Sequence, residues 1–168
     1  IALASTWLAV STTMRNNAIA VYSTKTDSFA KSRDARKQLE FVSHLFPANA
    51  DTWFTRARFL GADACEVSLA LCDIRIQSLY RAAANRPFWS FIWTSLARDL
   101  EQTGRVGEAI KALLRAIEFG PHEIWVRRAV SEIGLRQWPQ LAEVERAKVK
   151  QVLLQMFRSD RNLLVRSG

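Results

Sequence analysis

The sequence has few residues that interrupt helices, with only six glycines and four prolines in 168 residues. Sandwiches and barrels of β-strands need a turn roughly every 8–12 residues, so this scarcity argues against both classes. No segment alternates apolar and polar residues with a period of two for the length of a strand. The sequence therefore predicts an all-α protein in which short turns join long helices.

Cysteine is also scarce, because Cys65 and Cys72 are the only two in the chain. On a continuous helix a spacing of seven residues is a rise of about 10.5 Å, which exceeds the Cα separation that a disulfide tolerates. We expect one helix over 64–84, so the spacing argues against an intrachain disulfide. The two thiols are then predicted to be small, buried hydrophobic groups.

Residue patterns typical of catalysis or metal binding are missing. The two histidines, His44 and His122, have no cysteine or carboxylate nearby at ligand spacing. The chain has no glycine-rich phosphate loop, no G-x-S-x-G turn and no supported Cys/His signature. We therefore predict no metal, no cofactor and no enzymatic activity.

Acidic residues are fewer than basic ones, which gives a formal net charge of +8. The excess is concentrated near the C-terminus, where one acid, Asp160, accompanies six basic residues: Arg146, Lys148, Lys150, Arg158, Arg161 and Arg166. Such an end can be a solvated helix face, or it can bind nucleic acid, anionic lipid or an acidic partner. No nucleic-acid motif is present, so nucleic-acid binding through this end is kept as an alternative function.

Charge is absent from residues 1–14, but several of them are Ser or Thr, and a bilayer span needs about 20 apolar residues. Because the sequence begins with Ile1 and not Met, residues 1–22 are interpreted as the remnant of a membrane anchor, an ordinary first helix or the remnant of a signal peptide. A polar segment at 23–29 is predicted to be a linker.

The region between Phe88 and Pro121 has the pattern of a helical hairpin. Apolar residues recur with helical spacing on both sides of Gly104, which is suited to end the first helix in a left-handed conformation. Pro121 stops the second helix. The intervals from Pro47 to Pro87 and from Pro87 to Pro121 are 40 and 34 residues, which indicates a repeat with a longer second helix in its first copy.

These landmarks resemble the tetratricopeptide repeat (TPR) signature in both residue type and spacing. The residues that carry the resemblance, which we predict to pack the repeat, are Trp93, Leu96, Ala97, Leu100, Gly104, Ala109, Leu113, Ala116 and Pro121. Small alanines let two helices approach closely while the larger side chains fill the space around them. The resemblance implies a TPR-like α-solenoid of antiparallel helical hairpins, with a capping helix at its C-terminal end.

The expected domain organisation follows from this pattern. A repeat domain is predicted over 30–157, with its best repeat at 90–123 and a basic tail at 158–168. The expected helices cover roughly 3–22, 30–46, 50–61, 64–84, 89–103, 106–119, 123–135 and 140–157.

In the TPR family, ligands usually lie along the concave face formed by the first helices of the repeats. By repeat position, the partner-binding residues are predicted to be Phe54, Arg58, Phe91, Thr94, Arg98, Trp125 and Arg128. An arginine recurs in each unit, and guanidinium groups bind carboxylates in a bidentate manner. These arginines therefore predict a protein partner bound through an acidic segment or a chain terminus. The alternatives are an acidic glycan, or arginines that only pair with acids of the chain such as Glu101 and Glu132.

The segment 91–141 also resembles the C-terminal part of VpsP-type TPR proteins of bacterial exopolysaccharide biosynthesis. The resemblance is carried by the residues at 93–97, 116–123, 133–135 and 138–141. It implies a non-catalytic accessory component of a membrane-associated complex for polysaccharide synthesis or export, with the repeat domain in the periplasm. A structural subunit of another membrane assembly is the alternative.

Overall fold

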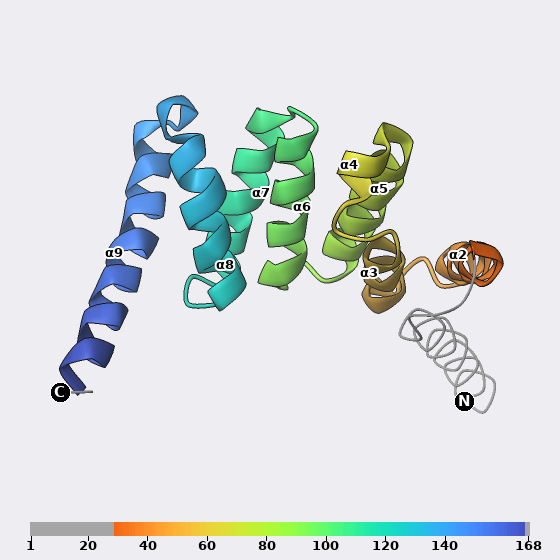
Figure 1. Ribbon diagram of the computed structural model, residues 1–168, viewed down its shortest axis with the longest axis horizontal. Coiled ribbons are helices and arrows are strands. Elements are labelled where there is room, and N and C mark those ends of the chain that lie inside the picture. Colours follow the sequence, from red (N-terminus) through yellow and green to blue (C-terminus); the bar gives the residue numbers. More distant parts are fainter. Residues whose placement is uncertain (1–28, 167–168) are drawn as a thin grey trace. The chain divides into compact units, whose positions relative to one another are not determined.

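A computed structural model describes the backbone of residues 29–166 and the side chains of residues 37–158 (Figure 1). Every regular element in this range is helical and none is a strand. The all-α prediction is therefore confirmed for this part of the chain. The predicted helix at 3–22 lies outside the described residues, as does the linker at 23–29 except for Phe29, which begins the first described helix. Within the described range, no helix is both long enough and apolar enough to cross a membrane.

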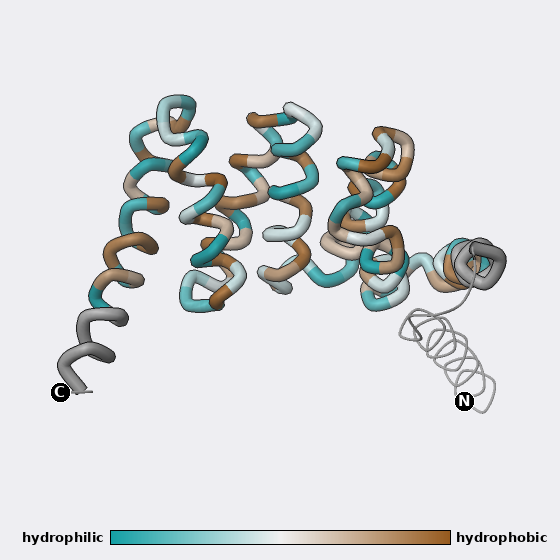
Figure 2. Tube along the Cα trace, in the orientation of Figure 1, coloured by the Kyte–Doolittle hydropathy of each residue, from teal (hydrophilic) through white to brown (hydrophobic). Residues whose placement is uncertain are grey.

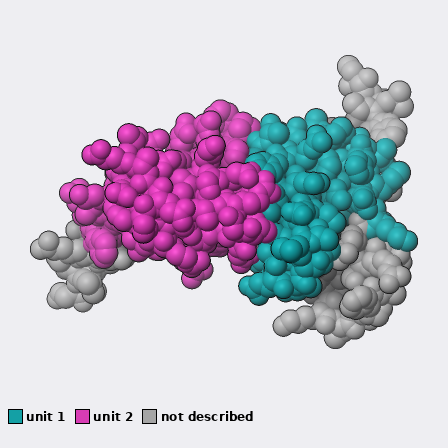
Figure 3. Space-filling view, turned by 90° about the horizontal axis from the view of Figure 1, so that it is seen from above, with its two compact units in different colours: residues 1–86 teal, residues 87–168 magenta. Residues whose placement is uncertain are grey.

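The chain divides into two compact units, residues 1–86 and residues 87–168, which Figure 3 colours separately. Each unit has buried hydrophobic residues of its own. The boundary falls at Arg86 and Pro87, between two predicted repeats. The units are described one at a time below.

The described part of the first unit contains α2 (Phe29–Leu45), α3 (Ala50–Phe59), α4 (Ala64–Val67) and α5 (Leu69–Asn85). Helix α3 is capped by Asn49, whose side-chain oxygen accepts hydrogen bonds from the backbone N–H groups of Asp51 and Thr52. Helix α3 packs against both α2 and α5. The buried hydrophobic residues at these contacts include Leu39, Val42, Trp53, Phe54, Ala57, Ile76, Leu79 and Ala82.

The expectation of a continuous helix over 64–84 is wrong, and so is the expectation that the cysteines are unpaired. Ser68 adopts an extended conformation, with φ −163° and ψ 131°, and separates α4 from α5. The chain folds back at this point, so that the Cα atoms of Cys65 and Cys72 are only 4.4 Å apart and their sulfurs form a disulfide. The helical rise assumed from the sequence does not apply across the break. Cys72 is fully buried, as expected from its apolar character.

The extra length of the first repeat lies in this break and not in a single longer helix. Gly61, at φ +87°, ends the α3 region, and α4 follows before α5 begins. The buried guanidinium of Arg75 donates from Nη1 to the carbonyl oxygens of Ala57 and Gly61, at 2.8 and 2.7 Å. Arg75 thereby satisfies carbonyl groups that the end of α3 would otherwise leave unpaired.

The second unit begins with the predicted hairpin, formed by α6 (Ser90–Gln102) and α7 (Val106–Phe119). Gly104, at φ +75°, makes the turn between them as expected. The residues at the helix contact are fully or almost fully buried: Leu96, Ala97, Leu100, Ala109, Leu113 and Ala116. Trp93 and Pro121 are half-buried, and Gly104 is exposed.

The predicted helix at 123–135 is shorter and less regular than expected. Helix α8 (Ile124–Ala129) continues into a π-helical turn, η1 (Val130–Gly134). A Cβ atom on Gly134 would lie 3.1 Å from a methyl carbon of Val149 in α9, so glycine permits this close approach. A short 3₁₀ turn, η2 (Trp138–Gln140), then leads into the last helix.

Helix α9 (Glu143–Arg166) is longer than the predicted capping helix at 140–157. Its start is stabilised by Glu145, whose carboxylate accepts a hydrogen bond from the backbone N–H of Ala142 at 2.9 Å. Because the helix continues to Arg166, most of the predicted basic tail at 158–168 is helical.

One tryptophan contact recurs in the two units. The indole N–H of Trp53 donates to the carbonyl oxygen of Pro47 at 2.9 Å, and that of Trp93 donates to Pro87 at 2.6 Å. In both cases the tryptophan lies six residues after the proline. The proline positions that reveal the repeat in the sequence therefore also hold the first helix of each hairpin.

Candidate partner-binding face

The candidate site in the second unit is formed by α6, α8 and the π-helical turn η1, which pack against one another (Figure 1). Side chains from α6 meet side chains that lie about 35 residues later, at the corresponding face of the next repeat. The cross-helix contacts involve Phe91, Arg98 and Glu101 on α6, and their partners on α8, on η1 and immediately after η1. We call this surface the α6/α8 face.

Two aromatic rings form the first part of the α6/α8 face. Phe91 and Trp125 meet edge to face, with ring centroids 5.4 Å apart and an interplanar angle of 88°. The indole N–H of Trp125 donates to the hydroxyl oxygen of Ser90 at 3.2 Å. Both rings are half-buried, so each keeps some surface that another molecule can contact.

Two arginines and one glutamate form the second part. Arg98 Nη2 lies 3.0 Å from Glu132 Oε2, and Arg128 Nε lies 3.7 Å from Glu132 Oε1. The π-helical turn carries Glu132 between the two arginines. The exposed fractions of these three side chains are 39% for Arg98, 74% for Arg128 and 45% for Glu132. Arg98 Nε is buried and has no hydrogen-bond partner among the described residues.

A second acidic residue closes the far end of the face. Glu101, whose side chain is only 9% exposed, accepts from Arg136 Nη1 at 3.1 Å and from Gln137 Nε2 at 2.9 Å. These contacts tie the end of α6 to the segment that follows η1. Sequence reasoning did not select Arg136 or Gln137, because they follow a turn whose π-helical geometry has no clear signal in the residue pattern.

Thr94 contributes little surface to the α6/α8 face. Its side chain is 1% exposed, and its hydroxyl donates to the carbonyl oxygen of Ser90 in the preceding helical turn at 2.9 Å. Successive residues of a helix are rotated by about 100° around its axis, so two positions that are adjacent in the sequence can differ in burial.

The remaining predicted partner-binding residues lie in the first unit. Phe54 is buried at 6% exposure, and the guanidinium of the exposed Arg58 lies over its ring, 6.0 Å from the centroid. Asp51 accepts a hydrogen bond from Arg86 at 3.3 Å. The structure thus brings Arg98 and Arg128 together on one carboxylate, whereas Arg58 stacks on an aromatic ring in its own unit.

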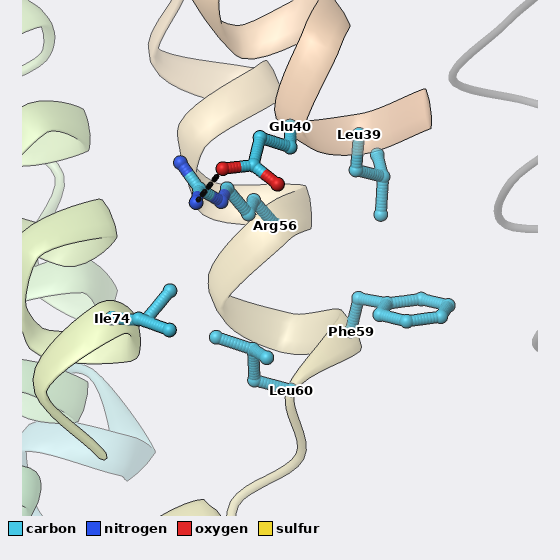
Figure 4. Close-up of a pocket in the computed structure, with 6 residues that line it drawn as sticks. All are labelled: Leu39, Glu40, Arg56, Phe59, Leu60 and Ile74. Carbon is cyan, nitrogen blue, oxygen red and sulfur yellow. Dashed lines mark ion pairs between the residues drawn. The ribbon is translucent and has the colours of Figure 1, made fainter. Parts of the chain in front are cut away.

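A small cavity of about 60 Å³ lies among α2, α3 and α5 in the first unit (Figure 4). Its lining is mostly apolar, and an ion pair between Arg56 and Glu40 at 3.6 Å closes one side. Its residues are Leu39, Glu40, Arg56, Phe59, Leu60 and Ile74. The volume corresponds to about two water molecules, which is far below the size of a typical small-molecule site.

The two histidines lie in different environments. His44 packs edge to face on Trp53, with centroids 6.1 Å apart, and His122 is exposed at the turn before α8. Among the described residues, no group of three or more His, Cys, Asp or Glu side chains converges as metal ligands do.

Comparison with known proteins gives structural matches only. No family model matches the sequence, and no curated protein matches it. A crystal structure of MamA is similar with a TM-score of 0.59 and 19% identity, covering 78% of this chain and 72% of MamA. SycD, a type III secretion translocator chaperone of Yersinia enterocolitica, is similar with a TM-score of 0.59 and 18% identity, covering 76% of this chain and 83% of SycD.

The fold is that of a TPR-like helical repeat protein. A second SycD structure, in complex with a peptide of the translocator YopD, is similar with a TM-score of 0.52 and 17% identity, and covers 86% of this chain and 92% of SycD. The TPR-like fold expected from the tryptophan, alanine, glycine and proline landmarks is therefore confirmed.

Proposed function

We propose that the chain is a non-catalytic protein-interaction module that binds an acidic segment of a partner protein on the α6/α8 face. The observation that carries the proposal is the sharing of one carboxylate, that of Glu132, by Arg98 and Arg128. A guanidinium group has five N–H donors, and a carboxylate satisfies two of them in a bidentate contact. The two arginines therefore have donors to spare for a second carboxylate.

In this proposal, the carboxylate of Glu132 occupies the position that a carboxylate of the ligand would take. It keeps the two guanidinium groups close together while the site is empty, and it reduces their net attraction for acids. An incoming carboxylate competes with Glu132 for the arginines.

The aromatic pair supplies the apolar half of the proposed site. Phe91 and Trp125 are fixed edge to face, and the hydrogen bond to Ser90 orients the indole. A rigid aromatic surface contributes contact area at a low cost in side-chain entropy. A ligand with an apolar side chain next to an acidic one fits both parts of the face.

The residues on the face are of the kinds that recognition surfaces use. They are arginines, carboxylates in ion pairs and aromatic rings. Peptide binding by a similar fold is represented by the SycD complex with a YopD peptide.

The cellular setting is part of the proposal. The VpsP-type resemblance supports an accessory role in membrane-associated exopolysaccharide synthesis or export. The disulfide between Cys65 and Cys72 supports an oxidising compartment such as the periplasm, because disulfides persist there and are rare in the cytosol of mesophiles.

The test measures binding of fluorescent synthetic peptides to the full chain by anisotropy. One peptide set alternates Glu or Asp with Leu or Phe, and a matched set replaces each acid with Lys. We expect only the acidic set to bind. Replacing both arginines, Arg98→Gln with Arg128→Gln, should weaken binding by about 100-fold or more, since at least two hydrogen bonds to a charged group are lost at about 1.5–3 kcal/mol each.

Two further variants make the test specific. Glu132→Gln removes the internal competitor and should tighten binding of the acidic peptides. Arg115→Gln with Arg81→Gln removes the same charge from exposed positions off the face and should leave binding unchanged. Equal binding of both peptide sets, or an unchanged dissociation constant in the Arg98/Arg128 variant, would contradict the proposal.

A further inference from the structure

The outer surface of α9 carries apolar and basic side chains that nothing in the described structure covers. Val144 and Phe157 are each 71% exposed and Leu154 is 47% exposed. Around a helical wheel these side chains and the exposed cations Lys148, Lys150 and Arg158 spread over about half of the circumference of α9, together with one exposed acid, Glu143. Figure 2 shows this mixture of hydrophobic and hydrophilic residues along α9. We call this surface the α9 face.

The cations of the α9 face are not paired with an acid in the described part of the chain. Lys148, Lys150 and Arg158 form no ion pair with any other described residue. A face that combines exposed apolar side chains with unpaired cations is complementary to a surface that combines apolar side chains with unpaired acids.

The first unit carries a surface of that kind at the break between α4 and α5. Val67 and Leu69, on either side of Ser68, are 68% and 72% exposed. Three exposed acids, Asp63, Glu66 and Asp73, lie within four residues of one or the other along the chain, and none forms an ion pair with another described residue. We call this surface the α4–α5 tip.

The disulfide gives the α4–α5 tip a defined shape. The bond between Cys65 and Cys72 joins the two helices across the extended Ser68. The backbone N–H of Ser68 donates to Ala64, and its carbonyl oxygen accepts from Cys72. Val67 and Leu69 are therefore presented by a braced turn, which lowers the entropy cost of binding compared with a flexible loop.

We propose that the α9 face of one copy of this chain docks on the α4–α5 tip of a second copy. Pairing of two α9 faces is disfavoured, because each face carries three cations, Lys148, Lys150 and Arg158, and only one acid, Glu143. Docking on the tip instead brings three cations to three carboxylates and buries apolar side chains from both sides. The contact is heterologous, so each copy has one of each surface and the association propagates from copy to copy. The proposed contact between copies involves neither Arg98 nor Arg128. Failure of this proposal would therefore leave the proposed binding of an acidic segment untouched, and the reverse also holds.

The experiment is multi-angle light scattering of the oxidised full chain over a wide range of protein concentration. We expect the mass to rise with concentration at low salt and to fall towards the monomer at high salt, as screening weakens the ion pairs. A mass that stays at the monomer value at every concentration would overturn the proposal.

Charge reversal then tests which surfaces meet. The tip variant, Glu66→Lys with Asp73→Lys, and the helix variant, Lys148→Glu with Lys150→Glu, should each remain monomeric alone. An equimolar mixture of the two should associate again, because each reversed surface then faces its opposite. A matched control for the helix variant, with the same change in net charge, is Lys37→Glu with Lys111→Glu, which should behave like the unmodified chain.

The apolar contribution has its own variants. Val67→Ser with Leu69→Ser should weaken association at least about tenfold without loss of helical circular dichroism, since both side chains are exposed in the monomer. Association of either charge variant alone, or failure of the mixture to associate, would refute the docking. So would a monomeric chain whose α9 face instead binds vesicles of anionic lipid.

Discussion

Single residues decide how closely the helices of the second unit approach. Ala97 on α6 and Ala116 on α7 are fully buried, and the large side chains of Leu100 and Leu113 pack around them. Two positions one helical turn apart differ in what they contact, because the buried Thr94 bonds to its own helix whereas the longer side chain of Arg98 reaches Glu132. The residue pattern gives the type of each side chain, and the packing of neighbouring helices decides what that side chain contacts.

Two glycines three positions apart should respond in opposite ways to replacement by alanine. Gly104 has φ +75° and Gly107 lies near the start of α7, and a Cβ atom would meet no neighbour within 4 Å at either position. Gly104→Ala should lower the free energy of unfolding by about 1–2 kcal/mol, because it places an L-residue in the left-handed region. Gly107→Ala should raise it by about 0.5 kcal/mol. Urea denaturation measures both, and losses of equal size would contradict a purely conformational origin.

At the scale of elements, the break between α4 and α5 is the main departure from a regular repeat. A continuous helix would have kept the two cysteines apart, whereas the extended Ser68 brings them together. The π-helical turn η1 is a second departure, and it places Glu132 between two arginines. Both irregularities lie at surfaces for which we propose binding. For η1 this agrees with the frequent occurrence of π-helical turns at functional sites.

Loss of the disulfide should destabilise the first unit. For a closed loop of this length, the chain-entropy model predicts a loss of about 2–3 kcal/mol in the free energy of unfolding. The expected result is a lower urea midpoint for the variant Cys65→Ala with Cys72→Ala. The unmodified chain in a reducing agent should show a similar midpoint, which separates the effect of the cross-link from that of the side chains. An unchanged midpoint in the reducing agent would contradict a structural role for the bond.

The whole molecule consists of two compact units, each with its own buried core. A repeat protein is stabilised mainly by contacts between neighbouring elements, so a local defect should first affect the unit that contains it. The TPR-like fold by itself identifies no partner, because unrelated functions share a fold. The proposed function therefore rests on the α6/α8 face and the proposed self-association on two other surfaces.

Overpacking one hairpin should show how far a defect spreads. Ala116→Leu adds methylene groups at a fully buried position and should cost about 1–3 kcal/mol. Hydrogen exchange should accelerate in α6 and α7 while the amides of α3 and α5 keep their rates. Lys111→Leu, at an exposed position on the same helix, should change stability by less than about 0.5 kcal/mol. Equal acceleration in both units would mean that the chain unfolds as a single cooperative unit.

The sequence by itself determined the helical class, the hairpin from Phe88 to Pro121 and most helix positions, because these depend on local periodicity and on glycine and proline as stop signals. Tertiary structure alone decided the disulfide, the extra turn of α4, the irregular end of α8 and the partners of Arg98 and Arg128. The physical reason is that glycine and proline act on the backbone at their own positions, which the sequence shows directly. Packing between elements decides where a helix breaks and which side chains meet when they lie about 35 residues apart in the sequence.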